Sequence, residues 1–259
     1  TLFFLTSIIF SKPMALSIND AQKMIATAKK HKKVLAVISQ LRYIKMVDEI
    51  KKALNRGDFG KITLINATLN CFKDKNYYTE SNWKGTLKKE GGSTLINQAI
   101  HTLDVVLWLK GIPEEVKSFG SNLKFKNIIN TEDTFTGIMK FSDSSLAIIS
   151  STNTSVEPWD SKIEIIGTKG SIIFSIGFPP KVLKLVHQDN KIAEKLKETL
   201  KPKIKKFDVP PSINYYGTTH REQMADFFNV VSGKSKKLFM EPKEALKTLS
   251  VVLDFYQYK

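Results

Sequence analysis

The residues best suited to chemistry lie in the segment EGGSTLINQAIHTLDVVLWLKG, residues 90–111. Two glycines interrupt the chain, and a mostly apolar stretch with helical spacing follows, yet it carries Asn97, His101 and Asp104. Side chains four residues apart lie one turn apart on one face of a helix, and Asp104 can reach that face. An imidazole can take a proton from a hydroxyl and return it, while an Asn97 amide suits a hydroxylated substrate. The alternative is a structural helix in which Asp104 satisfies a buried His101.

Four more candidates follow two short apolar runs. Lys12 and Pro13 come after the run that ends at Phe10, and Gln40 and Arg42 follow the run VLAVI. If both runs are parallel strands, these side chains lie at the carboxyl edge of the sheet, where ligands bind. Lys12 offers a compact positive charge to an alkoxide, carboxylate or phosphate, unless it is simply a solvated lysine at a strand end. Arg42 can clamp an anion or pair with a surface carboxylate.

The stretch NYYTESNWKG, residues 76–85, is rich in aromatic and polar side chains. Tyr77, Tyr78, Trp83 and Lys84 are suited to a sugar pocket, because aromatic faces stack on the C–H surfaces of pyranoses. Alternatively, Tyr78 and Trp83 anchor this loop onto a sheet.

A last group precedes the penultimate helix. Tyr216 and His220, with Arg221 beside them, can contribute to a substrate site, or they can form a helix cap and a surface pair.

The first part of the chain predicts a parallel arrangement. Residues 8–38 read as strand, helix and strand, with Ser17 as N-cap and Asp20 in a capping-box position. This is one βαβ crossover. A second helix, over residues 44–54, ends at the glycines of NRGDFG.

The remainder predicts a different sheet. Alternating or β-branched runs separated by turn residues indicate strands at residues 61–72, 134–143, 145–153, 161–176 and 181–188. Helices are expected at 97–109, 219–231 and 242–258, and the basic segment 191–207 begins as an amphipathic helix. The expected fold class is therefore α/β plus α+β: one βαβ unit in residues 1–57, then an open, mostly antiparallel sheet with helices on one face in residues 58–259.

Composition excludes several classes of protein. The chain has 259 residues, 42% hydrophobic and 25% charged, which is ordinary for a globular protein. A single cysteine, Cys71, excludes an internal disulfide, nothing resembles a zinc ligand set, and a cytoplasmic setting is the default. The apolar opening TLFFLTSIIF lacks a basic flank and is too short to span a bilayer, so we expect no membrane partner. The net charge of +15 is mostly dispersed lysine, which favours a solvated surface over nucleic-acid binding.

Several segments together resemble one family. SKPMALSINDAQKMIATAKKHKKVLAV, WKGTLKKEGGSTLINQAIHTLDVVLWLKG, NTEDTFTGIMKFSDSSLAIISSTN and YGTTHREQMADFFNVVSG are similar, in this order, to segments of the Gfo/Idh/MocA family of NAD(P)-dependent sugar and polyol oxidoreductases. The resemblance covers nearly all of residues 8–259. It implies that residues 1–57 are the last part of a dinucleotide-binding Rossmann domain and that residues 58–259 form a substrate-binding and oligomerisation domain.

The resemblance also implies roles for the candidates. His101 corresponds to the family's acid/base histidine, Lys12 to its positioning lysine, and Asn97 stands where many members carry aspartate. Contacts to NAD or NADP are expected from Lys12, Pro13, Gln40 and Arg42. The substrate, a sugar, nucleotide sugar or polyol, is expected to contact Lys12, Tyr78, Trp83, Lys84, Asn97, His101, Tyr216 and His220. Family members form oligomers through the open face of the C-terminal sheet.

The sequence departs from the family pattern in three ways. Ser11 replaces a glutamate, Asn97 cannot titrate, and no G-x-G-x-x-G fingerprint for the cofactor pyrophosphate occurs. We therefore expect a truncated or degenerate member that binds NAD(P) weakly or not at all. The alternative function is a non-catalytic sugar-binding or oligomerisation module.

Overall fold

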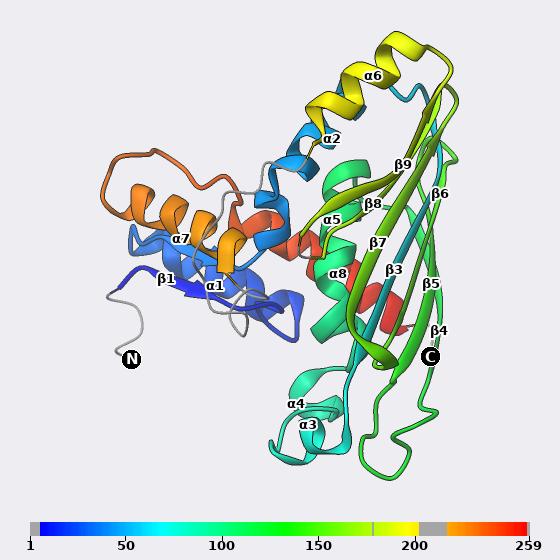
Figure 1. The fold of residues 1–259 in the computed structure, drawn as a ribbon. Helices are drawn as coiled ribbons and strands as arrows, with labels where there is room; N and C mark the ends of the chain where they lie inside the picture. Colours follow the sequence, from blue (N-terminus) through cyan, green and yellow to red (C-terminus); the bar gives the residue numbers. More distant parts are fainter. Residues whose placement is uncertain (1–5, 178, 202–216, 258–259) are drawn as a thin grey trace.

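The computed structural model describes residues 6–177, 179–201 and 217–257, and they contain two separate sheets (Figure 1). The smaller sheet is a parallel pair, β1 (Ile8–Phe10) and β2 (Leu35–Val37), joined by helix α1 (Ile18–Lys30). The βαβ unit expected from the sequence is confirmed. Ser17 caps α1 as expected, because its Oγ accepts a hydrogen bond of 3.1 Å from the Asp20 amide.

The larger sheet has seven strands in the order β4-β5-β6-β3-β7-β8-β9. The strands are β3 (Ile62–Phe72), β4 (Glu115–Ser121), β5 (Thr134–Lys140), β6 (Leu146–Thr152), β7 (Thr154–Gly167), β8 (Gly170–Ser175) and β9 (Lys181–His187). β3 pairs parallel with β6, and the other pairs are antiparallel. The open, mostly antiparallel sheet is therefore confirmed. Strand β4, at its edge, was not anticipated.

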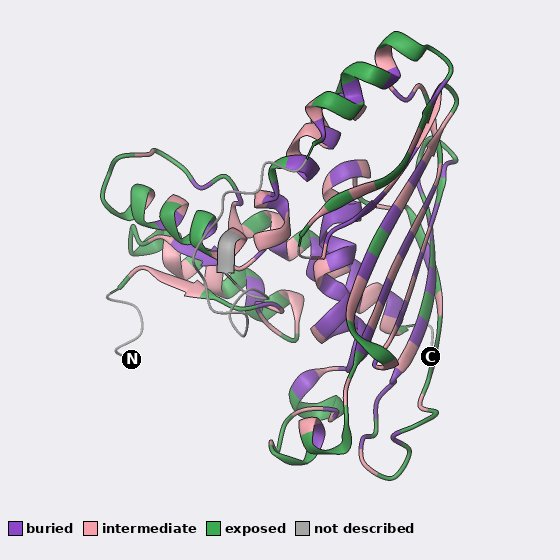
Figure 2. Cartoon of the chain, viewed as in Figure 1, coloured by how far each residue is buried: buried purple, intermediate pink, exposed green. Residues whose placement is uncertain are grey.

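Helices cover one face of this sheet (Figure 1). Along β5 and β6 alternate residues are buried, and these pack beneath α5 (Ile100–Lys110) and α8 (Pro242–Gln257) (Figure 2). Phe135 and Phe255, for example, meet edge to face with 5.4 Å between ring centroids. The opposite face keeps large side chains such as Phe119 and Ile138 exposed. Successive side chains of a strand point to opposite faces of the sheet. The residues between the buried ones therefore lie on the face that these helices do not cover.

The remaining helices surround these two sheets. The 3-10 helix η2 (Gln40–Tyr43) and helix α2 (Lys45–Asn55) connect the βαβ unit to β3. Short helices α3 (Lys75–Thr79) and α4 (Leu87–Glu90) follow β3, the π-helix η3 (Thr94–Ala99) precedes α5, and α6 (Asn190–Thr199) follows β9. The final pair is α7 (Gly217–Val231) and α8. In the described ranges, no helix has the length and apolar character needed to cross a membrane.

Helices α7 and α8 pack on the βαβ unit, although they are far from it in sequence. Leu249 of α8 shares a buried cluster with Met14 and Leu35, and Phe227 of α7 packs with Ala36. Gln223 adds two hydrogen bonds to the end of β2, since it accepts from the Ser39 amide at 2.8 Å and donates to the Val37 carbonyl at 2.9 Å. The C-terminal helices therefore complete the core of the N-terminal unit.

Candidate active site

The polar helix of the sequence analysis is not a single regular α-helix. Residues Thr94–Ala99 form a π-helix, and the α-helix begins only at Ile100. Two glycines precede the π-helix, and the structure requires a glycine at each position for a different reason. Gly91 ends α4 with φ of 83°, a left-handed conformation that favours glycine, and a Cβ on Gly92 would lie 2.1 Å from the Tyr256 hydroxyl oxygen. Single π-helical turns within a helix, like the one at Thr94–Ala99, are frequent at functional sites.

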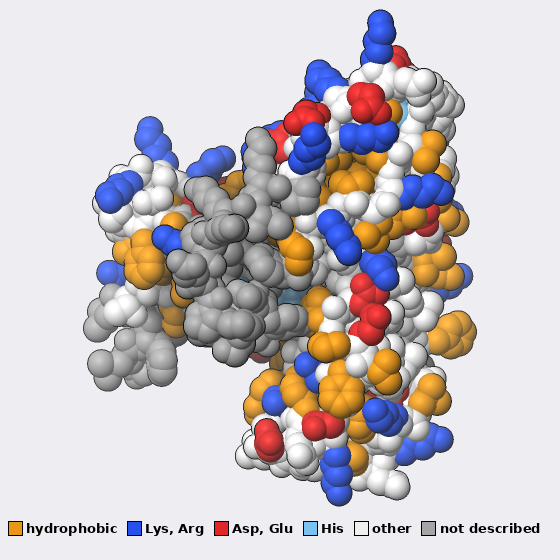
Figure 3. All heavy atoms as spheres, viewed as in Figure 1, with side chains coloured by type: hydrophobic (Ala, Val, Ile, Leu, Met, Phe, Trp, Pro, Cys, Tyr) orange, Lys and Arg blue, Asp and Glu red, His pale blue; other side chains and the backbone are white. Residues whose placement is uncertain are grey.

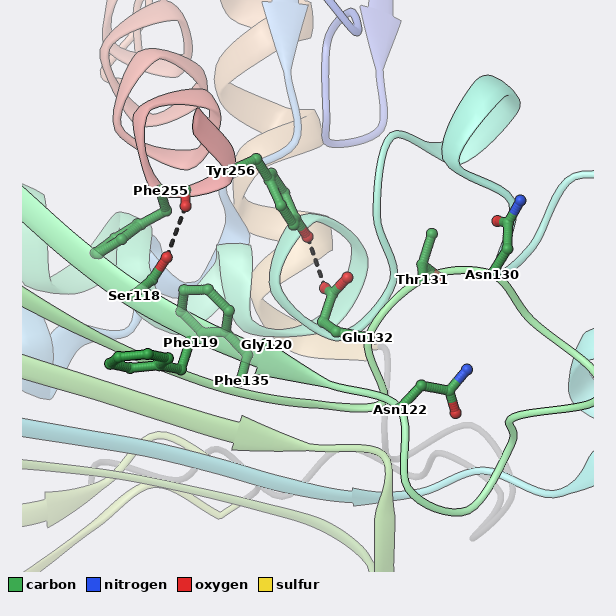
Figure 4. A pocket seen from close by; sticks show the side chains of 10 residues that line it. All are labelled: Ser118, Phe119, Gly120, Asn122, Asn130, Thr131, Glu132, Phe135, Phe255 and Tyr256. Atoms are coloured by element: carbon green, nitrogen blue, oxygen red, sulfur yellow. Dashed lines mark hydrogen bonds between the residues drawn. The ribbon is translucent and has the colours of Figure 1, made fainter. Parts of the chain in front are cut away.

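Glu132 holds the start of this π-helix. Its Oε1 accepts hydrogen bonds from the backbone amides of Ser93 (3.1 Å) and Leu95 (3.2 Å), and the Tyr256 hydroxyl donates to it at 2.6 Å. Figure 4 shows the bond between Tyr256 and Glu132 at the edge of a pocket of about 460 Å³, which lies between α8 and strands β4 and β5. A carboxylate at a helix N-terminus satisfies amides that have no partner within the helix. The residues that hydrogen-bond the start of this helix thus lie 37 and more positions away from it in sequence.

His101 lies in the first turn of α5 and is mostly buried, and its Nδ1 has no hydrogen-bond partner among the described residues. The pKa of His101 is lowered to about 3, mainly by burial and also by the charges of Lys12 and His220, while Asp104 acts in the opposite direction. The structure therefore brings Lys12, His101, Asp104 and His220 into one electrostatic environment. At pH 7 the imidazole is neutral, the form that can accept a proton.

Asp104 is fully buried and is the anionic centre of this group. The Arg42 guanidinium donates to both its oxygens, Nε to Oδ2 at 3.0 Å and Nη2 to Oδ1 at 2.8 Å, and Thr248 donates at 2.8 Å. The charges of Lys12 and Arg42 hold the pKa of Asp104 well below its usual range, against the effect of burial. Asp104 is thus bound to Arg42 and Thr248, and the alternative in which it serves to satisfy His101 does not fit these contacts.

Lys12 completes the ion cluster. Its side chain is 2% exposed, and Nζ lies 3.4 Å from Asp104 Oδ2. The pKa of Lys12 is lowered to about 8, because burial and the charge of Arg42 outweigh the opposite effect of Asp104. The alternative of a solvated lysine at a strand end is therefore wrong, because this ammonium is inside the protein. A buried lysine with a lowered pKa can release and regain a proton near neutral pH.

Arg42 does not form the surface ion pair that was considered as an alternative above. It is 3% exposed, its guanidinium is committed to Asp104, and Nη1 lies 3.5 Å from Glu244. It therefore has little capacity left for a cofactor phosphate, and we correct its expected role as an anion clamp. Gln40, by contrast, keeps a buried Oε1 without a partner in the described residues, and Pro13 lies partly exposed next to Lys12.

Asn97 joins a second group of polar residues. Its Nδ2 donates to the buried carboxylate of Glu90 and lies 3.5 Å from the Tyr77 hydroxyl, to which Gln98 Nε2 also donates, at 3.1 Å. Burial raises the pKa of Glu90, whereas its hydrogen bonds from Asn97 and Gly85 lower it. Sequence reasoning missed Glu90. The signal available was an acidic residue immediately before a glycine pair.

The aromatic stretch divides between two roles. Tyr78 is 3% exposed, and its hydroxyl accepts from Asn153 Nδ2 at 2.8 Å, so its contacts fit the loop-anchor alternative rather than an open sugar pocket. Trp83 is 43% exposed, and Lys84 Nζ lies 3.9 Å from the centroid of the Tyr77 ring. Tyr216 lies outside the described residues, and His220 lies in α7, beside the His101 group.

Comparison with known proteins places this arrangement in a family. Residues 47–173 match the GFO/IDH/MocA C-terminal domain. Residues 47–173 therefore belong to the Gfo/Idh/MocA family. This confirms the resemblance of the sequence and makes the chain a relative of oxidoreductases.

Two curated relatives are similar to part of the chain. The 2,7-anhydro-N-acetylneuraminate hydratase of Mediterraneibacter gnavus is 30% identical over 164 residues, which are 62% of this chain and 42% of that protein. Myo-inositol 2-dehydrogenase of Thermotoga maritima is 26% identical over 166 residues, 62% of this chain and 47% of that protein. The chain thus spans about half the length of the curated relatives it matches.

Solved structures with the same fold cover nearly the whole chain. The WlbA dehydrogenase from Bordetella pertussis, in complex with NADH and UDP-GlcNAcA, has a TM-score of 0.80 and 23% identity over 97% of this chain and 70% of its own. Levoglucosan dehydrogenase, in complex with NADH and levoglucosan, has a TM-score of 0.74 and 18% identity over 97% of this chain and 71% of its own. At this identity the likeness establishes the fold.

Proposed function

We propose that this chain contributes the substrate site of an NAD(P)-dependent oxidoreductase that acts on a hydroxyl of a sugar, nucleotide sugar or polyol. The observation that carries the proposal is the neutral His101 next to the buried Lys12–Asp104 pair. His101 can accept the hydroxyl proton, because its Nδ1 is not engaged and its pKa of about 3 keeps it unprotonated at pH 7.

Lys12 stabilises the charge that develops on the substrate oxygen. A positive group fixed in a poorly solvated site acts on an alkoxide more strongly than it would in water. Asp104, which is itself fixed by Arg42, holds this ammonium in place, and Asn97, whose amide is already oriented by Glu90, positions the substrate by hydrogen bonding.

The residues present fit one end of a nicotinamide cofactor. The unpartnered Gln40 Oε1 and the ammonium of Lys12 follow the two parallel strands at their carboxyl edge, where such ligands bind. When bound, NAD or NADP supplies the acceptor for a hydride. Several solved relatives are complexes with NADH or NAD. Because this chain carries no glycine fingerprint, we expect the chain alone to bind the dinucleotide weakly.

Two further properties belong to the proposal. The open face of the seven-stranded sheet, with Phe119 exposed by 85% and Ile138 by 49%, is expected to be covered by a second copy of the chain. Cys71 is a free buried thiol, consistent with the reducing cytoplasm.

Binding and turnover should be measured separately. Saturation-transfer NMR with a panel of sugars and polyols is expected to show binding that weakens in Lys12→Met. NADH formation from NAD⁺ in the same mixtures is expected to require His101. Binding without turnover, in the presence of saturating NAD⁺, would support the non-catalytic sugar-binding alternative. Absence of binding to every member of the panel would contradict the proposed function.

A further inference from the structure

Two lysine side chains lie against one tyrosine ring next to the proposed substrate site. Lys84 Nζ is 3.9 Å and Lys73 Nζ is 4.5 Å from the centroid of the Tyr77 ring. The lysines come from different segments, since Lys73 follows β3 and Lys84 follows α3. Neither ammonium forms an ion pair with any of the described residues. We call these three residues the lysine–tyrosine cluster.

Two positive charges at one ring repel each other. Burial lowers the pKa of Lys73, and the charge of Lys84 lowers it further, while Cys71 and Asp74 act in the opposite direction. The electron-rich face of the ring attracts each ammonium, and more strongly where water is excluded. The ring therefore stabilises each ammonium but neutralises neither, and an anion is the group that would.

Two acids act on the charges of this cluster: Asp74 on Lys73, and Glu90 on Lys84. Glu90 feels the charge of Lys84, but one of its oxygens accepts from the Gly85 amide and the other from Asn97 Nδ2. Burial also raises its pKa, which favours the uncharged form. The lysine–tyrosine cluster thus keeps its excess of positive charge.

The cluster is joined to the proposed catalytic helix by hydrogen bonds. The Tyr77 hydroxyl accepts from Gln98 Nε2 at 3.1 Å and lies 3.5 Å from Asn97 Nδ2. Asn97 precedes His101 by four residues, about one helical turn, so the Tyr77 hydroxyl lies near the segment that carries both side chains. Beyond the lysines, the half-exposed ring of Trp83 lies 5.9 Å from Lys84 Nζ. Figure 3 shows basic side chains among hydrophobic ones in this lower part of the molecule, where α3 and α4 lie.

We propose that Lys73 and Lys84 bind an anionic substituent, a carboxylate or a phosphate, of the sugar whose hydroxyl is placed at His101. The substrate class is then acidic sugars rather than neutral sugars or simple polyols. This inference rests on the proposed function, because it concerns the same site. The hydrated, compact ammonium groups of two lysines suit either anion.

The test compares matched probes on the full chain by isothermal titration calorimetry at low salt and pH 7. The probes are glucuronate against glucose, galacturonate against galactose, and glucose 6-phosphate. We expect at least one acidic sugar to bind about tenfold more tightly than its neutral partner, with the difference shrinking as KCl is added. The relative affinities of the uronates and the sugar phosphate decide between carboxylate and phosphate.

Variants connect this preference to the two lysines. Lys73→Gln and Lys84→Gln are each expected to remove most of the preference for the acidic sugar. Lys84→Arg should keep it. Lys243→Gln is the matched control, since Lys243 is exposed and pairs with Glu241.

The outcomes separate this inference from the proposed function. Equal binding of neutral and acidic sugars by the unaltered chain would overturn the inference and leave the proposed function standing. A preference for acidic sugars that survives in the folded double variant, Lys73→Gln with Lys84→Gln, would likewise overturn the inference and leave the proposed function standing. If none of the probes binds, the proposed function fails and this inference with it. Because the first comparison uses the unaltered chain, a variant that does not fold leaves that result decisive.

Discussion

Arg42 and Asp104 form a buried, bidentate ion pair between residues 62 positions apart in sequence. Arg42 lies in η2, directly after the βαβ unit, and Asp104 lies on the helix that covers the large sheet. Thr248 of α8 donates to the same carboxylate. One carboxylate therefore connects the N-terminal unit, the central helix and the C-terminal helix, and it also holds Lys12.

Asp104→Asn should destabilise the fold strongly. Removing the carboxylate leaves the buried Arg42 guanidinium with only the more distant Glu244, a loss of about 3–5 kcal/mol in the free energy of unfolding. Thr248→Val is the control, because it removes one hydrogen bond and should cost about 1 kcal/mol. Urea unfolding measures both. Equal losses in the two variants would show that Asp104 acts only as a hydrogen-bond acceptor.

His101 should make the fold sensitive to mild acid. Its pKa is about 3 in the folded chain and 6.5 ordinarily, so below pH 6.5 the unfolded chain binds a proton that the folded chain does not. The free energy of unfolding then falls by up to about 1.4 kcal/mol per pH unit as the pH drops from 6.5 toward 3. Asp104 adds acid sensitivity only below its ordinary pKa of 3.8. In His101→Gln, urea unfolding between pH 4.5 and 7 should show a flatter dependence; an unchanged slope would place the titration elsewhere.

His101→Gln should also separate catalysis from binding. In an active oxidoreductase that contains this chain, loss of the proton acceptor should lower kcat by about 10²- to 10⁴-fold with a change in KM of only a few fold. Steady-state rates of NADH formation measure both constants. A variant with nearly unaltered kcat would assign His101 a structural role.

The open face of the large sheet should control the oligomeric state. Ile138 pairs with Ile148 on this face, and a lysine at position 138 would place a charge in the proposed contact. Sedimentation velocity is expected to show a dimer or larger assembly for the unaltered chain and a monomer for Ile138→Lys. Lys140→Gln, on the same strand face, is the control. A monomeric unaltered chain would rule this interface out.

Most of the elements follow from local patterns in the sequence. The βαβ unit was predictable because Ser17 and Asp20 mark the start of α1 and apolar runs flank it. The central strands were predictable from alternation. β4 was missed because its sequence EVKSFGS alternates weakly and carries a glycine next to its last residue, so its strand conformation depends on pairing with β5.

The candidate site was only partly predictable, for a related reason. Asn97, His101 and Lys12 have residue types and positions that indicate chemistry on their own. The π-helix depends on Glu132 and Tyr256, and the burial of Arg42 depends on Asp104, so neither follows from the residues nearby in sequence. The role of Tyr78 as an anchor likewise requires Asn153, 75 positions later.

The packing of α7 and α8 against the βαβ unit has a consequence for biosynthesis. The first strands leave the ribosome long before Phe227 and Leu249, which cover their apolar side. Until translation reaches these helices, the nascent chain exposes Leu35 and Ala36 to chaperones and to neighbouring polypeptides. Synthesis of α7 and α8 is thus the step that covers the apolar residues of β2.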